Sequence, residues 1–278
     1  MEKWTRSKRT KTPCGNFLSK RGFPKPIRCI KRRKEELTEE IKTEGICLRA
    51  VEYGESDRII TLLTDKLGKI AVRARGVSSP RSKLRHAAIP FSFGEYILTL
   101  KGDFYSLKSF DYNDAFTSVS DDLVRYFAGT AGLEIADKLT EESVSVSVEL
   151  ARLLRLLMSL CYDGGGLGAL LSYLLDMLKI AGYRISRGEM APGRDPKYFV
   201  FDLEEGGFYS SAIHSAYAVK MTTPAATLLV DFSEGKEREG DAEAFAEIFA
   251  LLSRYVKVKT GSNLRALFEL CDLLRNGS

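Results

Sequence analysis

Residues 66–85 form a run of cations, and two adjacent aromatic residues, Phe104 and Tyr105, follow later in the sequence. Residues 66–85 contain seven Lys or Arg and no Asp or Glu. Cations neutralise phosphate groups and exposed rings stack on bases, so this mixture is typical of a groove that follows a single-stranded nucleic acid. The alternative is a solvated charged face above aromatic residues of the core. The candidate DNA-binding residues are Lys66, Lys69, Arg73, Arg75, Arg81, Lys83, Arg85, Phe104 and Tyr105.

The sequence does not indicate a catalytic or metal centre. His86 and His214 are the only two histidines, which leaves few general bases. The acid pair Glu204 and Glu205 adjoins a predicted turn, where we expect both carboxylates to be solvated. The five cysteines have no metal-ligand spacing and predict reduced cytoplasmic thiols. We therefore expect no enzyme activity, no catalytic residue, no metal and no cofactor.

Alternating apolar residues predict the strands that position the cations. The alternation covers residues 46–51, 60–62 and 70–74, and two further strands are expected at 91–100 and 104–110. Arg73 and Arg75 lie two apart and should share one face, opposite Val72 and Ala74. Gly68 can adopt the positive φ of a tight hairpin. Five strands are the number found in an OB-fold barrel.

The spacing of apolar residues changes to a helical period after residue 117. Ser120 is a candidate cap for the first helix, and Gly182 is a candidate stop for the third. Thr222 or Thr223 could cap a later helix that has Pro224 in its first turn. Between the third helix and Pro224, two strand-like runs at 197–202 and 206–209 predict one β-hairpin. The helices are expected at residues 118–138, 144–161, 167–181, from 222 or 223 onward, 241–258 and 263–274.

The predicted fold class is therefore α+β, an N-terminal five-stranded OB-fold barrel followed by an α-helical domain with a small β-hairpin insert. We expect a basic flexible tail at 1–36, the barrel at 37–116 and the helical domain at 117–278, with the insert at 183–216. Residues 1–34 carry 13 Lys or Arg and one acid, whereas the rest carries 29 against 36. Such a tail cannot bury enough apolar surface to offset the entropy of ordering it. The string at 34–42 has high helix propensity and predicts a short lead-in helix.

Membrane insertion and secretion are not expected, because no apolar run of about 18 residues occurs and the leader has no apolar segment. The basic tail has two explanations, a non-specific DNA tether or an extension from a start codon assigned too early.

Short motifs in and around the barrel lie at residues 41–46, 53–58, 61–64, 67–69, 74–77, 80–85 and 90–91. In this order and spacing they resemble the amino-terminal domain of the bacterial RecO recombination mediators. The resemblance implies an OB-fold followed by a helical domain, and a cytoplasmic, nucleoid-associated protein that binds and anneals single-stranded DNA. It also implies loading of RecA onto DNA coated by single-strand binding protein, together with RecR. The implied partners are single-stranded DNA, RecR, the C-terminal tail of single-strand binding protein and, indirectly, RecA.

The chain departs from this family at the zinc site. Many RecO proteins carry two CxxC pairs around such a hairpin, which hold a tetrahedral zinc ion. Here residues 186–192 and 210–215 contain no Cys, and His214 alone supplies one ligand where four are needed. The insert is therefore expected to be a degenerate zinc ribbon without metal.

Two functions compete on these observations. The cationic loop favours a non-enzymatic protein that binds and anneals single-stranded DNA. The acidic remainder favours a protein-interaction scaffold whose barrel binds nucleic acid only weakly.

Overall fold

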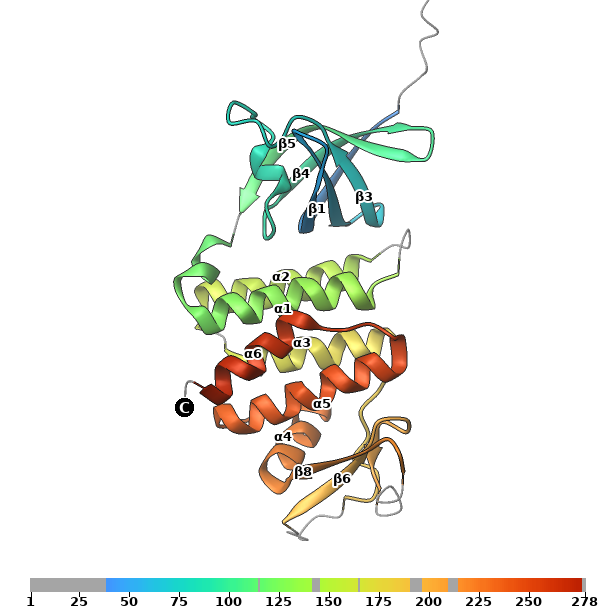
Figure 1. Cartoon of the computed structure of the whole chain (residues 1–278), viewed down its shortest axis with the longest axis vertical. Coiled ribbons are helices and arrows are strands. Elements are labelled where there is room, and N and C mark those ends of the chain that lie inside the picture. Colours follow the sequence, from blue (N-terminus) through green and yellow to red (C-terminus); the bar gives the residue numbers. More distant parts are fainter. Residues whose placement is uncertain are drawn as a thin grey trace, which may run out of the picture. The chain divides into compact units, whose positions relative to one another are not determined.

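A closed five-stranded barrel begins the part of the chain that the computed structural model describes (Figure 1). The described residues are 39–114, 116–141, 146–164, 166–190, 197–209 and 215–276. The predicted tail therefore lies outside them. The barrel strands are β1 (Glu40–Tyr53), β2 (Asp57–Thr64), β3 (Gly68–Ala74), β4 (Phe93–Lys101) and β5 (Phe104–Asp114), in the order β1-β2-β3-β5-β4. This order confirms the predicted OB-fold barrel.

Strand β1 closes the barrel because it pairs with two neighbours. Its first half is antiparallel to β4, from Glu40 opposite Thr99 onward, and its second half is antiparallel to β2, ending with Tyr53 opposite Asp57. The pairing with β4 corrects the predicted lead-in helix over residues 40–42, since ladder hydrogen bonds outweigh local helix propensity. A bulge at 47–49 bends the strand between its two partners.

The inward side chains of the strands form the core of the barrel. Ile60, Leu62, Val72 and Leu98 have no solvent exposure, as the alternation predicted. Tyr96 is also fully buried, and its hydroxyl donates to the carbonyl oxygen of Ser92 at 3.2 Å. The barrel interior is thus filled with side chains and leaves the outer face for ligands.

Within the described residues, six α-helices follow the barrel, and two short 3₁₀ turns, η1 (Arg85–Ala88) and η2 (Thr117–Asp121), precede them. The cap of the first helix is Asp122 and not Ser120, because the Asp122 carboxylate accepts from the backbone N–H of Arg125 at 2.8 Å. Gly182 ends the third helix with φ 86°, as predicted. The helices are α1 (Leu123–Leu139), α2 (Ser147–Tyr162), α3 (Leu167–Ile180), α4 (Thr223–Ser233), α5 (Ala242–Thr260) and α6 (Arg265–Asn276).

The insert between α3 and α4 is a three-stranded sheet, where the sequence predicted a single hairpin. Its strands β6 (Tyr198–Asp202), β7 (Gly207–Phe208) and β8 (Ala218–Thr222) lie in the order β7-β6-β8. Strand β8 went unrecognised because it is short and runs directly into α4. Among the described residues, none of the helices is both long and apolar enough to cross a membrane.

Barrel and helices share one apolar cluster. Ile46, Leu48 and Leu63 belong to the cluster that the helices build, and so do Phe91 and Phe116. Both phenylalanines adopt positive φ, 72° and 46°, a conformation that a bulky side chain rarely takes. Burial of the two rings in the shared cluster compensates the backbone strain.

We predict that Gly94→Ala destabilises the barrel much more than Gly102→Ala. A Cβ atom at Gly94 would lie 2.3 Å from the carbonyl oxygen of Asp111, so β4 and β5 would have to move apart, at a cost of about 3 kcal/mol. Gly102 has open space and φ 62°, which costs an alanine about 1 kcal/mol. Urea unfolding of both variants measures the difference, and equal losses would contradict the register of β4 against β5.

Candidate nucleic-acid interface

The predicted cations separate into two groups along β3. Lys66 and Lys69 lie at the end of the barrel where β2 turns into β3. The Lys66 ammonium donates to the carbonyl oxygen of Lys42 at 2.8 Å, and the Lys69 ammonium donates to that of Asp137 in α1 at 2.6 Å. Lys69 is only 9% exposed. Its ammonium group bonds a carbonyl oxygen in the last turn of α1 and is not available to a phosphate. Lys69 is therefore removed from the candidate DNA-binding residues.

Arg73 lies near the other end of β3, whereas Arg75 follows the last residue of that strand, Ala74. Arg73 is held in place, because its Nη2 atom lies 2.8 Å from the Asp57 carboxylate and its guanidinium lies over the Tyr53 ring, 5.0 Å from the ring centroid. Arg75 is exposed and makes no hydrogen bond or salt bridge with a described residue, although its charge also helps to lower the pKa of Asp57. Of this pair, Arg75 is therefore the one whose guanidinium is open to a ligand.

The Asp57 carboxylate ties the cationic loop, residues 76–85, to the strands. It accepts from the backbone N–H of Gly76 at 2.9 Å as well as from Arg73. These two donors, the Gly76 N–H first, hold the pKa of Asp57 below its ordinary value. The N–H of Ser78 also donates to the carbonyl oxygen of Ser56 at 3.0 Å. The loop is thus fastened to the turn between β1 and β2.

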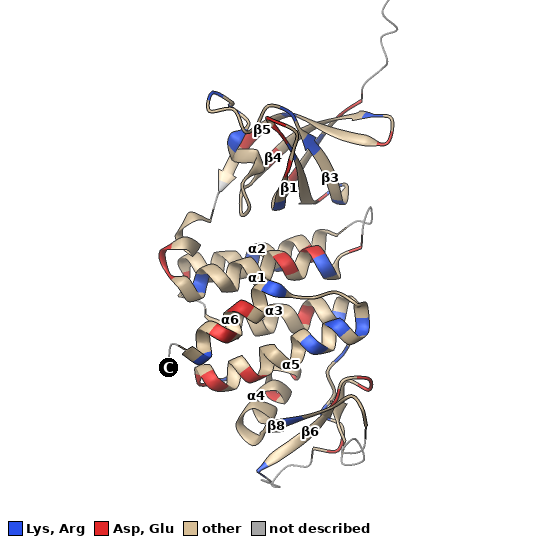
Figure 2. Ribbon diagram, in the orientation of Figure 1, with Lys and Arg blue, Asp and Glu red and all other residues tan. Residues whose placement is uncertain are grey.

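The cationic loop turns apolar side chains inward and charged ones outward. Val77 is 1% exposed, and Leu84 packs against the barrel core. Arg81, Lys83 and Arg85 are exposed, and Figure 2 shows Lys and Arg along β3 and at the turn that follows it. Within the part of the chain that the structure describes, these three side chains make no hydrogen bond or salt bridge. The loop therefore presents three uncompensated cations on a fixed backbone.

The two aromatic candidates point in opposite directions. Phe104 is 77% exposed at the start of β5, whereas Tyr105 is half-buried and packs against the barrel core. Adjacent residues of a strand face opposite sides, so only one of them can meet a ligand on the outer face. Phe104 keeps its candidate role, and Tyr105 contributes to the core.

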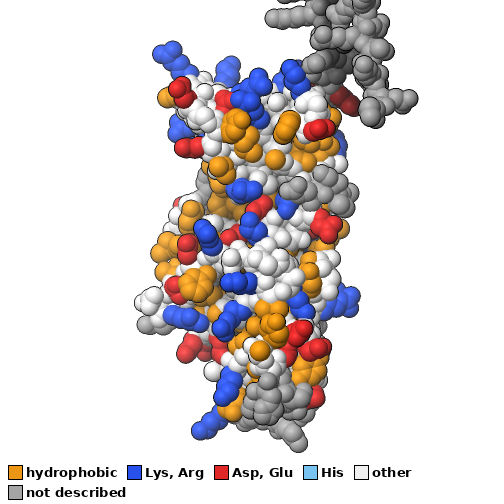
Figure 3. Space-filling model, turned by 45° about the vertical axis from the view of Figure 1, so that its right-hand side comes forward, with side chains coloured by type: hydrophobic (Ala, Val, Ile, Leu, Met, Phe, Trp, Pro, Cys, Tyr) orange, Lys and Arg blue, Asp and Glu red, His pale blue; other side chains and the backbone are white. Residues whose placement is uncertain are grey.

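Sequence inspection missed two apolar side chains on the same outer face. Val51 and Tyr53 of β1 are each 52% exposed. The ladders place Val51 opposite Ile59, Ile59 opposite Arg73, and Arg73 beside Ser106 of β5. Val51 thus lies in a row of paired residues that leads to β5, the strand that carries Phe104. Tyr53 lies two residues further along β1 on the same face. Figure 3 shows apolar side chains among Lys and Arg on one side of the barrel.

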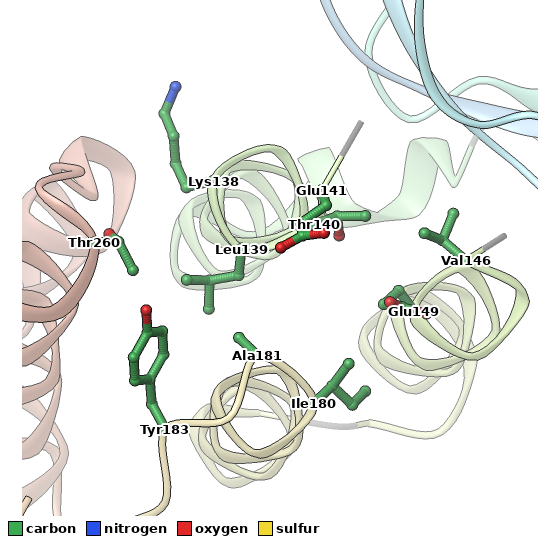
Figure 4. Close-up of a pocket in the computed structure, with 10 residues that line it drawn as sticks. All are labelled: Lys138, Leu139, Thr140, Glu141, Val146, Glu149, Ile180, Ala181, Tyr183 and Thr260. Atoms are coloured by element: carbon green, nitrogen blue, oxygen red, sulfur yellow. The ribbon is translucent and has the colours of Figure 1, made fainter. Parts of the chain in front are cut away.

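A pocket among the helices is a poor match for phosphate. It has a volume of about 410 Å³ and lies where α1, α3 and α5 end and α2 begins. Its lining includes Leu139, Ile180 and Tyr183, the acids Glu141 and Glu149 and the cation Lys138 (Figure 4). Three helix C-termini and two carboxylates repel anions, against one cation and one helix N-terminus. Among the described residues, no cluster of three or more His, Cys, Asp or Glu could hold a metal ion.

Comparison with known proteins identifies the family to which the barrel belongs. The family described as "Recombination protein O N terminal" matches residues 38–116, which include all five barrel strands. The DNA repair protein RecO of Exiguobacterium sibiricum is 30% identical over 252 residues, which cover 85% of this chain and 98% of that protein. The chain belongs to the RecO family of DNA repair proteins.

Further RecO proteins match over a similar span. The RecO of Thermobifida fusca is 31% identical over 242 residues, covering 81% of this chain and 96% of its own. The RecO of Exiguobacterium strain AT1b is 26% identical over 243 residues, covering 84% and 96%. These matches confirm the family resemblance that the motifs indicated. They assign the chain to DNA repair and recombination.

We predict that Asp57→Asn lowers stability at neutral pH but not in acid. Because the folded-state pKa of Asp57 lies below its unfolded value of about 3.9, its contribution is present above that pH and is lost as the pH falls through the folded pKa. Urea unfolding from about pH 7 down to well below about pH 3.9 should show the difference between variant and parent shrinking as the pH falls through the folded pKa. Asp103→Asn, at an exposed turn, is the control. A penalty for Asp57→Asn that persists in acid would contradict a role for the charge.

Proposed function

We propose that this RecO protein binds single-stranded DNA on the outer face of its barrel and anneals complementary strands. The observation that carries the proposal is a set of exposed cations that make no hydrogen bond or salt bridge with any described residue, Arg75, Arg81, Lys83 and Arg85. Phe104, on another strand of the same barrel, adds a ring that is 77% exposed. Phosphates would be neutralised by the cations while bases stack on the ring. Because the loop backbone is already fastened through Asp57, little ordering entropy would be lost on binding.

The charge distribution supports binding at the barrel. Residues 44–115 carry 11 Lys or Arg and 9 acids, whereas residues 116–278 carry 17 against 23. An acidic surface repels a phosphate backbone at low salt, so contacts should concentrate on the barrel face. In this proposal the helical region serves partner proteins.

The proposal extends to the partners that the family implies. The protein would help to load RecA onto DNA coated by single-strand binding protein, and would act with RecR. It would do so without enzyme activity or a cofactor, since annealing requires charge neutralisation and base alignment but no covalent step. The thiols of Cys47 and Cys271 fit this proposal, because burial raises the pKa of each to about 12 and leaves them poor nucleophiles.

We predict that the double variant Arg81→Glu, Lys83→Glu binds an oligonucleotide at least about tenfold more weakly, a loss of about 1.4 kcal/mol. Loss of two phosphate contacts should flatten the plot of log K against log salt by about 1.4 units, at about 0.7 per contact. Fluorescence anisotropy over a salt series measures both quantities. The protein for this test should start at Leu37, so that the cations of residues 1–34 do not contribute.

The matched control is Arg254→Glu, Lys257→Glu on α5, two exposed residues that give the same change of charge. Its affinity should change much less. If the barrel variant keeps both affinity and slope, its cationic loop is a solvated face and the proposal fails.

A second candidate function, protein docking, is favoured by a groove between β1, α1 and α6. The groove has a volume of about 410 Å³ and an apolar floor that includes Phe91, Leu133 and Ala266. Glu134, on its wall, accepts from the first N–H groups of α6, at 2.9 and 2.8 Å. The Arg265 guanidinium has no partner within the described residues. Three cations and three acids line the groove, but Glu134 caps α6 and Asp137 pairs with Arg49 and Lys138, which leaves Arg265 and Glu269. A tail with acidic residues and an apolar end, which the resemblance to RecO implies for single-strand binding protein, would place an acid on Arg265 and its apolar end on the floor.

We predict that Arg265→Glu weakens binding of a labelled acidic, apolar-ended peptide by about tenfold, because the variant replaces a favourable charge pair by repulsion. Arg275→Glu, an exposed residue at the other end of α6, is the control. Anisotropy with both variants measures the effect, and equal peptide affinity would remove the groove as the docking place.

A further inference from the structure

Tyr53 is an exposed aromatic residue on the outer face of the barrel, and hydrogen bonds hold its neighbours Arg73 and Asp57 in place. It ends β1 directly opposite Asp57. The Arg73 guanidinium lies over its ring at 5.0 Å from the centroid, and 52% of the side chain remains exposed. One face of the ring is therefore covered by a cation, and the exposed part of the side chain is available to a ligand.

The cation beneath the ring is itself fixed. Both the Nε and the Nη2 atoms of Arg73 donate to the Asp57 carboxylate, at 3.1 and 2.8 Å. Asp57 is fixed in turn by the Gly76 N–H. Since a planar guanidinium stacks on an aromatic ring, this chain of contacts holds the Tyr53 ring against a rigid support.

We propose that the exposed part of the Tyr53 side chain is a stacking platform for one unpaired nucleobase. This deepens the proposed function, on which it rests. The platform and Phe104 stand on different strands, β1 and β5, which are not neighbours in the barrel. The two rings would thus receive different bases of the same strand, while the loop cations receive its phosphates.

The Tyr53 ring would stack on any of the four bases, but only on a base that is unpaired. Every base has a π face, so stacking on a ring discriminates little between sequences. A paired base in a duplex has both faces covered by its neighbours. Arg73 would serve as a positioning residue here, because its charge is compensated by Asp57 and it cannot act as a free phosphate contact.

The first test uses fluorescence at the platform. Trp4 is the single tryptophan of the sequence, so Trp4→Phe with Tyr53→Trp yields a full-length chain with one reporter. Oligothymidylate should quench this emission, and duplex DNA should not. The control is Trp4→Phe with Tyr198→Trp, since Tyr198 is also an exposed ring covered by a cation, Lys220 at 4.8 Å. Its emission should be unchanged.

The second test uses affinity. Tyr53→Ser should weaken oligothymidylate binding between about fivefold and about 150-fold, the range for loss of one stacked base. The salt slope should stay constant, because stacking releases no counterions. Tyr53→Phe keeps the ring and should bind as the parent does, which separates stacking from a folding defect. Tyr198→Ser should bind normally.

Failure of the platform and failure of the proposed function give different results. If the parent binds oligothymidylate, but emission at position 53 is unchanged and Tyr53→Ser keeps its affinity, the platform is wrong and the cationic loop alone carries binding. If the parent does not bind single-stranded DNA at all, the proposed function is wrong and the platform falls with it.

Discussion

Closure of the barrel through β1 is the constraint on which the rest of the structure depends. One strand of 14 residues must satisfy backbone groups of both β2 and β4. It can do so only by bending, and a Cβ atom at Gly45 would lie 2.8 Å from the carbonyl oxygen of Leu63 at that bend. The bend brings the end of β1 beside Asp57, which places Tyr53, Arg73 and the cationic loop on one face.

Within that face, charge compensation decides which cations are available. Seven cations fall within residues 66–85, but the fold gives them different surroundings. Lys69 completes a helix end, Lys66 donates to the carbonyl oxygen of Lys42, and Arg73 is compensated by Asp57. Arg81, Lys83 and Arg85 lie on a loop whose backbone is held by a carboxylate. In the proposed DNA-binding face, the Asp57 carboxylate therefore orders the groups that would meet a phosphate backbone.

Much of the fold followed from local patterns, because strand alternation and helical period reflect burial directly. The pattern failed where tertiary pairing overrides propensity, as at residues 40–42, or where an element is too short to show a period, as in β8. The candidate site was harder to predict. The partner of Lys69 lies 68 residues along the chain, and the cation beneath Tyr53 lies on another strand. Opposite orientations of Phe104 and Tyr105 follow from alternation once the register of β5 is known, but sequence alone does not fix that register.

The shared apolar cluster makes the barrel dependent on the helices that follow it in the chain. Ile46, Leu48 and Leu63 are buried only because the helices cover them. A gene fragment that ended after β5 would encode a barrel with three large aliphatic side chains newly open to water, a surface prone to association. The barrel is therefore not a portable module, and recombination between genes could transplant it only together with the helices against which it packs.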